Sequence, residues 1–384
     1  MHAYAAVYLL SHGFSNTLVG ILLAVANVLS AVIQPMIAGI IDKPGWLTNR
    51  RFILTAMSGM LIGALLLMIV PDNKAATFII YVIIYMLQFA YQPVMTAICF
   101  EYQKAGHDIF YGLARGLGSA GFAVTAAIIG GVVERHGTTI LMIVTAVVMA
   151  ISLVVVYFFR IPGEGDATKG SDDAASSENA EPVGNAHNNV RDFARTYPAF
   201  TLFLAVAVCF FFAHNMINDF MIQIIRNLGG GETELGLANF LQAILELPVM
   251  ALSGFVLKKI TSDKLLLTSG VAFLVKTIIM LLAVNLAMMY LSQSFQLFAY
   301  AVFIPASAYY VSQTMEPLDQ VKGQAYVTSA ITVGGVFSNL ISGAILDHFG
   351  VRAMLSVGSV VCAIGVVIAF VAFSRLPHYQ NNDK

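Results

Sequence analysis

Charged residues are scarce in this chain, and their scarcity excludes a water-soluble protein. Only 11% of the 384 residues are charged and 58% are hydrophobic, whereas soluble domains carry about 25% charged residues. The mean hydropathy of +0.81 is typical of a chain that is mostly membrane-spanning helix. The 20 basic and 21 acidic residues nearly cancel and form no basic tract, so nucleic-acid binding is not supported.

Motifs for enzymatic chemistry are also missing. The sequence contains no Gly-x-x-x-x-Gly-Lys-Ser/Thr string that would bind ATP phosphates and no His-Glu-x-x-His that would hold zinc. The three cysteines, Cys99, Cys209 and Cys362, lie far apart inside apolar runs without metal-ligand spacing. We interpret them as packing residues, and we expect no enzyme activity, no cofactor and no metal site.

Apolar runs long enough to cross a bilayer follow one another along the chain. Residues 1–10 are apolar but too short to cross, and they lack the basic flank and cleavage site of a signal peptide. We expect them to be the outer end of a first helix that is largely missing from this chain. Eleven complete spans are predicted, at residues 16–41, 52–70, 77–100, 110–133, 138–159, 198–224, 233–257, 265–285, 289–312, 323–346 and 351–373.

Basic residues are unequally divided between the two sides of the predicted spans. With the central loop placed in the cytoplasm, fourteen Lys and Arg residues fall inside and four outside, in accord with the positive-inside rule. Residues 163–189 are rich in Gly, Ala, Ser, Asn and acidic residues and have too few large apolar side chains to fold. We predict a protein of the cell (plasma or inner) membrane with an N-terminal helix bundle at 1–160, a flexible cytoplasmic linker at 161–197, and a C-terminal bundle with a short cytoplasmic tail at 198–384.

The two predicted bundles share short sequence patterns. Residues 130–137 (GGVVERHG) end one span, and residues 343–350 (GAILDHFG) end another. Residues 17–20 (TLVG) likewise resemble residues 233–236 (TELG), and both stand at the start of a span. Two repeats of six helices around a midplane cavity are typical of a secondary transporter.

Together these features resemble the major facilitator superfamily, and within it the branch of lactose permease (oligosaccharide:proton symporters) and phenylpropionate permease. Gln34-Pro35, Ala38 and Asp42-Lys43 are similar to the inner-loop signature of the superfamily, with Ala38 where glycine is usual. This resemblance implies a major facilitator fold of two six-helix bundles and a cytoplasmic gate formed by Asp42, Lys43, Arg50 and Arg51.

Other segments resemble the branch and also depart from it. Residues 111–122 (YGLARGLGSAGF) are similar to its most recognisable segment, which implies that Arg115 contacts substrate. Residues 245–248 and 258–276 resemble phenylpropionate permease, with Lys276 where the branch usually carries arginine. The histidine and glutamate that couple protons in lactose permease match Gln296 and Ala299, and its sugar-binding carboxylate matches Ala97. The resemblance therefore implies neither lactose specificity nor that permease's full proton relay.

Three ionisable residues lie inside predicted spans, where an isolated charge is unfavourable. We predict that Glu246, Lys276 and Asp219 serve proton coupling, with Glu246 alternately meeting Lys276 and water. A Glu246→Gln variant would then lose uphill accumulation. Glu246 as a hydrogen-bond partner between helices and Lys276 as a purely structural counter-charge are the alternatives. For Asp219, a second proton site with His214 and an outer-gate ion pair with Arg226 are equally open.

Polar stripes predict the substrate. At 100° per residue, each stripe occupies an arc of about 60° on its helix. Amide groups bind hydroxyls as donors and as acceptors, and aromatic faces pack on sugar rings. We therefore expect a neutral polyhydroxylated substrate. The alternative is that these tyrosines and glutamines only hold neighbouring helices together. The predicted substrate-binding residues are Tyr81, Tyr85, Gln88 and Gln92 on one span, Asn239 and Gln242 beside Glu246 on another, Gln293, Gln296 and Tyr300 on a third, and Arg115. The span at 16–41 adds Asn27, Ser30 and Gln34 on one face.

The leading hypothesis is a monomeric transporter in the lipid bilayer that couples the import of an oligosaccharide or glycoside to protons by alternating access. An importer of aromatic acids or nucleosides is a second hypothesis, and an anionic substrate would then require both Arg115 and Lys276. A drug or metabolite exporter and an intramembrane enzyme or sensor are further alternatives.

Overall fold

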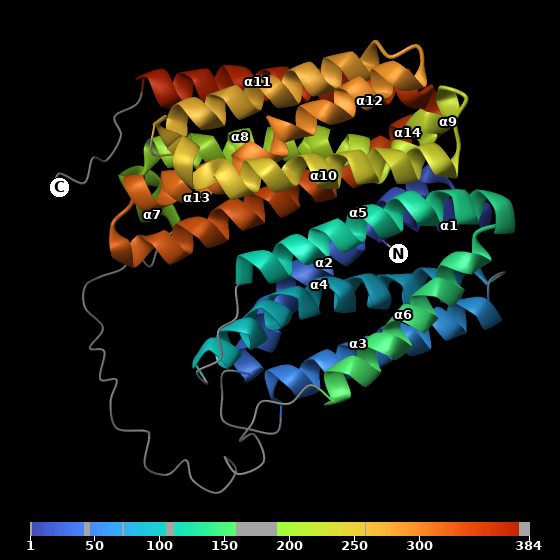
Figure 1. The fold of residues 1–384 in the computed structure, drawn as a ribbon. Helices are drawn as coiled ribbons and strands as arrows, with labels where there is room; N and C mark the ends of the chain where they lie inside the picture. Colours follow the sequence, from blue (N-terminus) through green and yellow to red (C-terminus); the bar gives the residue numbers. More distant parts are fainter. Residues whose placement is uncertain are drawn as a thin grey trace, which may run out of the picture.

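The chain folds into two bundles of long α-helices that lie side by side (Figure 1). The computed structural model describes residues 2–41, 47–70, 73–104, 111–158, 190–257 and 259–375. Within these ranges the regular structure is entirely helical. The predicted all-α membrane class is thereby confirmed, whereas the count of eleven spans and the domain boundaries stay predictions.

The first bundle is formed by the N-terminal half of the chain. Its helix α3 packs against α4 and α6, and α2 packs against α4. Thr48 begins α3 as an N-cap, because its Oγ1 accepts a hydrogen bond from Arg51 N at 3.3 Å. The elements are η1 (His2–Tyr4), α1 (Ala5–Ser11), α2 (Asn16–Ile41), α3 (Asn49–Ile69), α4 (Lys74–Lys104), α5 (Tyr111–His136) and α6 (Thr139–Phe158).

The short N-terminal helix is a buried part of this bundle. Val7, Tyr8 and Leu9 of α1 are at most 1% exposed. Tyr4 Oη donates to Ala126 O at 2.8 Å, and Tyr8 Oη donates to Leu67 O at 3.2 Å. These contacts tie residues 2–11 to α5 and α3.

The second bundle is formed by the C-terminal half. Its core holds stacked and edge-on rings, among them Phe203, Phe210, Phe273 and Phe303. The last helix bends at Gly350, whose φ of +79° favours glycine, and the bend separates the predicted spans 323–346 and 351–373. The elements are α7 (Val190–Thr196), α8 (Pro198–Asp219), α9 (Met221–Asn227), α10 (Glu232–Leu257), α11 (Ser262–Leu281), α12 (Leu286–Ser294), η2 (Phe295–Leu297), α13 (Tyr300–Thr314) and α14 (Pro317–Arg375).

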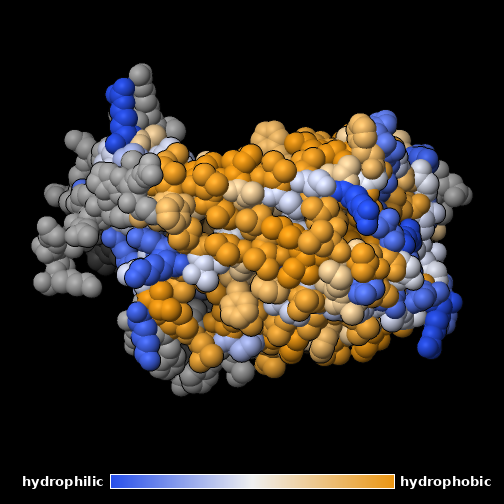
Figure 2. Space-filling model, turned by 90° about the horizontal axis from the view of Figure 1, so that it is seen from above, coloured by the Kyte–Doolittle hydropathy of each residue, from blue (hydrophilic) through white to orange (hydrophobic). Residues whose placement is uncertain are grey.

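The outer surface carries a hydrophobic belt. Figure 2 shows a broad hydrophobic band with hydrophilic residues gathered at both ends of the molecule. Of the described helical stretches, nine are long and apolar enough to cross a membrane. Large apolar side chains such as Val147, Ile151 and Val154 of α6 are exposed. In a bilayer these side chains face lipid.

Candidate functional site

The two bundles touch most closely at one end of the molecule. There α2 crosses α14, and α5 crosses α10. Glycines allow these crossings: a Cβ on Gly20 would clash with Asn339 O, and one on Gly236 would clash with Ala126 O. Gly343 and Gly130 are equally close to the backbone of the opposite bundle. We call this end the latch end, and the opposite end, where α6 finishes and α7 begins, the linker end.

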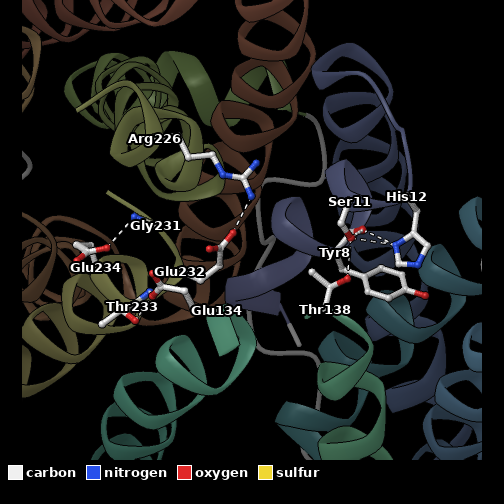
Figure 3. Close-up of polar contacts among 10 residues, drawn as sticks. All are labelled: Tyr8, Ser11, His12, Glu134, Thr138, Arg226, Gly231, Glu232, Thr233 and Glu234. Atoms are coloured by element: carbon white, nitrogen blue, oxygen red, sulfur yellow. Dashed lines mark hydrogen bonds and ion pairs between the residues drawn. The ribbon is translucent and has the colours of Figure 1, made fainter. Parts of the chain in front are cut away.

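An acidic residue caps a helix of the other bundle at each of these crossings. Asp347 of α14 accepts hydrogen bonds from Asn16 N at 3.1 Å and from Thr17 N at 2.8 Å, at the start of α2. Glu134 of α5 accepts from Thr233 N at 3.3 Å and from Thr233 Oγ1, at the start of α10 (Figure 3). A carboxylate at a helix N-terminus satisfies free N–H groups and interacts favourably with the helix dipole.

The two caps occupy matching positions in the repeated sequence patterns. Glu134 and Asp347 stand at the same place in GGVVERHG and GAILDHFG, and Thr17 and Thr233 both begin the pattern that ends in Gly20 or Gly236. The repeat that was visible in the sequence therefore forms the same contact twice. We call the pair of caps and their four glycines the latch.

The Asp347 cap gives the latch a defined pH response. Burial alone would raise the pKa of Asp347, which lies just beyond the predicted span, but the hydrogen bonds from Thr17 and Asn16 outweigh it and lower the pKa below 3.8. A carboxylate with a lowered pKa stabilises the closed latch above its ordinary pKa, and this contribution is lost only as the pH falls through the lowered value.

Because Asp347 stays ionised between about pH 8 and pH 5, we expect Asp347→Asn to weaken latch closure to the same extent at both pH values. The distance between spin labels on Ser15→Cys, before α2, and His348→Cys, on α14, measures closure, since both positions are exposed on opposite bundles. Asp263→Asn, at the start of α11, is the matched control and should leave this distance unchanged. A difference between the Asp347 protein and Asp347→Asn that disappears at pH 5 would contradict the expectation.

A cavity of about 470 Å³ lies between the bundles. Aromatic side chains and two carboxyl groups contribute to it: Tyr85 and Phe89 from the first bundle face Phe211, Tyr300, Asp219 and Glu246 from the second. A second cavity of about 720 Å³ shares Asp219 and Glu246 and extends along α4 and α5 to Cys99 and Gly118. The amides that line the first cavity are Asn27, Gln34, Asn215, Asn218, Gln242 and Gln296.

Glu246 and Lys276 are joined through Gln296. Lys276 Nζ donates to Gln296 Oε1 at 2.6 Å, and Gln296 Nε2 donates to Glu246 Oε1 at 3.1 Å. Lys276 is 1% exposed and lies behind Gln296, whereas Glu246 and Gln296 face the cavity. The predicted partnership of Glu246 and Lys276 thus takes the form of an amide-bridged pair.

A second chain of amides continues from α8 to α12. Gln242 Nε2 donates to Asn218 Oδ1 at 3.1 Å and to Gln293 Oε1. The nitrogen of the Asn218 amide then faces His214 Nε2 at 2.9 Å. Because this amide donates, His214 Nε2 accepts and the imidazole is neutral. The ring of His214 stacks on that of Tyr300, with centroids 5.1 Å apart.

Asp219 ends α8 at the wall of both cavities. The amide of Asn339 lies beside its carboxyl group, and Tyr85 of α4 lies within electrostatic range. The alternative of an outer-gate ion pair between Asp219 and Arg226 is wrong. Arg226 instead pairs with Glu232 at 2.6 Å (Figure 3).

The other predicted substrate-binding residues divide into two groups. Gln92 and Asn239 line the second cavity, as Gln242 does. The predictions for Tyr81, Gln88 and Gln293 need correction, because neighbours in the same bundle cover Tyr81 and Gln293 and because Gln88 faces a different cavity. Tyr81 is 1% exposed and stacks on Tyr8, Gln88 lines a separate small cavity inside the first bundle, and Gln293 is fully buried behind Gln242.

The predicted cytoplasmic gate is only partly visible. Asp42 and Lys43 lie outside the described residues, as does the side chain of Arg115 on α5. Arg50 donates to Val156 O at 3.2 Å and to Tyr157 O at 2.5 Å, at the end of α6. Arg50 therefore caps carbonyl groups within its own bundle, and Arg51 is exposed near the start of α3.

Several lining residues were not predicted from the sequence. Thr328, Ser329 and Thr332 of α14 line the first cavity, together with His2 and Phe89. The three hydroxyl residues recur at helical spacing. This spacing is only a weak indication of a binding site, because such side chains also donate hydrogen bonds to carbonyl groups of their own helix. Indeed, Thr332 Oγ1 donates to Thr328 O at 3.0 Å.

Comparison with known proteins places this architecture in a family. The sequence matches the MFS_1 like family over residues 1–357, whereas no curated protein sequence matches.

The fold is similar to those of two solved transporters. One is the nucleoside transporter NupG, with 14% identity, a TM-score of 0.76, and coverage of 98% of this chain and 95% of that chain. A mutant of NupG gives a TM-score of 0.79, with coverage of 98% of this chain and 96% of that chain. The other is a bacterial homologue of the human lysosomal transporter Spinster, with 12% identity, a TM-score of 0.67, and coverage of 97% and 92%. The chain belongs to the MFS_1 like family and is a transporter of the major facilitator superfamily.

Proposed function

We propose that this transporter carries a neutral polyhydroxylated solute, an oligosaccharide or glycoside, together with protons. The observation that supports this proposal is the lining of the first cavity, which amide side chains form together with the rings of Tyr85, Phe89 and Tyr300. Amides bind hydroxyl groups in both senses, and the rings pack on the apolar face of a sugar. The cavity volume of about 470 Å³ suits a small-molecule ligand.

The latch supports an alternating-access cycle. The bundles are in contact at the latch end, and the second cavity extends toward the linker end. With the linker end in the cytoplasm, as the basic residues predict, this state faces inward. Rocking of one bundle against the other would open the latch and close the linker end, with a single chain as the working unit in the cell membrane.

Nucleoside import is the second candidate. The fold similarity to a nucleoside transporter favours it, and the same amides would bind base edges as well as ribose hydroxyls. Import of aromatic acids has less support. Asp219 and Glu246 are the carboxyl groups of the first cavity, and no lysine or arginine lines it among the described side chains.

The test is external pH in lightly buffered, de-energised cells that express the chain, during pulses of oligosaccharides, glycosides, nucleosides and aromatic acids. We expect one compound class to alkalinise the medium, and a protonophore to abolish the signal. Cells without the chain and cells with the Ser356→Ala variant, altered at an exposed position, are the controls. Uptake without any pH change would refute coupling, and a response to aromatic acids alone would refute the neutral substrate.

A further inference from the structure

Two carboxyl groups face the first cavity, and their surroundings differ in charge. Glu246 is linked to the ammonium group of Lys276 through Gln296, so this group of three side chains is neutral as a whole. Asp219 lies at the same cavity on α8. The cation closest to it in sequence, Arg226, is bound to Glu232.

Among the described side chains, the groups that face Asp219 from neighbouring elements are neutral. They are the Tyr85 phenol of α4 and the Asn339 amide of α14, with Gln242 of α10 on the same cavity wall. The titratable bases that line this cavity in the described part of the chain are His2 and His214. His214 accepts from Asn218 and is neutral, and His2 packs edge-on against Tyr85 with centroids 4.9 Å apart.

Alternating access requires both carboxyl groups to pass through a state closed at both ends, where water is largely excluded. A carboxylate without a counter-charge is strongly unfavourable in such a place, whereas a bridged ion pair is tolerated. The charge-balanced Glu246 can therefore stay ionised throughout the cycle. The uncompensated Asp219 can be enclosed favourably only as the acid.

We infer that Asp219 carries the coupled proton and that Glu246 remains ionised and binds substrate hydroxyls. This inference rests on the proposed symport. In the outward-open state a carboxylate oxygen of Asp219 takes a proton from water, and in the inward-open state it returns that proton to water, with no other bond made or broken. Gln296 serves as a positioning residue that holds Glu246 toward the cavity.

The experiment compares Asp219→Asn with Glu246→Gln in the full chain, at equal abundance in the membrane. For Asp219→Asn we expect loss of alkalinisation and of uphill accumulation, while counterflow exchange of preloaded substrate persists and no longer depends on pH. For Glu246→Gln we expect counterflow itself to fall at least tenfold. Asp219→Ser is a second neutral variant that gives the same readouts if the asparagine variant does not accumulate.

The outcomes separate the inference from the proposed symport. If the unaltered chain takes up substrate without alkalinisation, the symport and this inference both fail. If the unaltered chain alkalinises the medium and the Asp219 variants still do so, the symport stands and the inference is overturned. Loss of accumulation with intact exchange in Glu246→Gln would likewise overturn it and return the proton to Glu246.

Discussion

Gly20→Leu is expected to reduce substrate uptake by at least about tenfold. A side chain at this position would meet the backbone oxygen of Asn339, which cannot move aside as a flexible side chain would. Overpacking of this kind typically costs about 1–3 kcal/mol, and it acts only on the state in which the latch is closed. The transporter would therefore be trapped with the latch open, and uptake would fall because the cycle requires closure.

The control lies on the same helix. A Cβ on Gly39 of α2 would meet open space, so Gly39→Leu should transport normally. Gly236→Leu, at the matching position of α10, should reproduce the Gly20 defect. The distance between spin labels on Ser15→Cys and His348→Cys should increase in the Gly20 and Gly236 variants and stay unchanged in the Gly39 variant. Normal uptake by Gly20→Leu would show that the observed closure is not part of the cycle.

Lys276→Met is expected to abolish uptake and to destabilise the protein, by less than the roughly 3–5 kcal/mol typical of a fully buried direct pair, because Glu246 faces the cavity. The substitution leaves Glu246 without the buried ammonium group that balances its charge through Gln296. Removal of one partner of a buried ion pair is more costly than removal of both, because the remaining charge is left uncompensated. Thermal unfolding in detergent measures the effect.

The double variant Lys276→Met with Glu246→Gln separates charge from packing. It should recover most of the lost stability, because no uncompensated charge remains, and it should still fail to transport. Lys264→Met, at an exposed position of the same helix, controls for the loss of a lysine as such. A double variant as unstable as Lys276→Met alone would show that the lysine acts through packing rather than through charge.

The helices were largely predictable because apolar length alone determines a membrane span. The predicted runs at 16–41 and 233–257 agree closely with α2 and α10, and the boundary before residue 351 falls at the bend at Gly350. The repeated patterns predicted similar bundles. They did not predict that Glu134 and Asp347 cap helices of the opposite bundle, because a sequence repeat does not say which surfaces meet.

The site was predictable on α10 and only partly on α4. Asn239, Gln242 and Glu246 all reach a cavity. On α4, Tyr81 and Gln92 share a helix face but are separated by about 16 Å along the axis, and the neighbours of a helix change over that distance. Tyr81 meets Tyr8 of α1, whereas Gln92 meets open cavity.

The bridging position of Gln296 could not be predicted either. A uniform helical stripe through the predicted span 289–312 assumes one regular helix, but α12 and α13 are joined by the 3-10 turn η2. Gln296 lies in this turn, which changes the direction of its side chain relative to a continuous helix. Glu246 and Lys276 were recognised as partners from their charge, and the amide between them was assigned to the substrate.

The latch has the geometry of a symmetric dimer interface within one polypeptide. Each half provides one capping carboxylate, Glu134 or Asp347, and one helix N-terminus, near Thr17 or Thr233, that the carboxylate of the other half caps. An interface in which the same surface meets its own copy is isologous, and it leaves neither a capping carboxylate nor a helix N-terminus unpaired. Half of such a chain would present one of each, and could therefore pair with a second copy of itself.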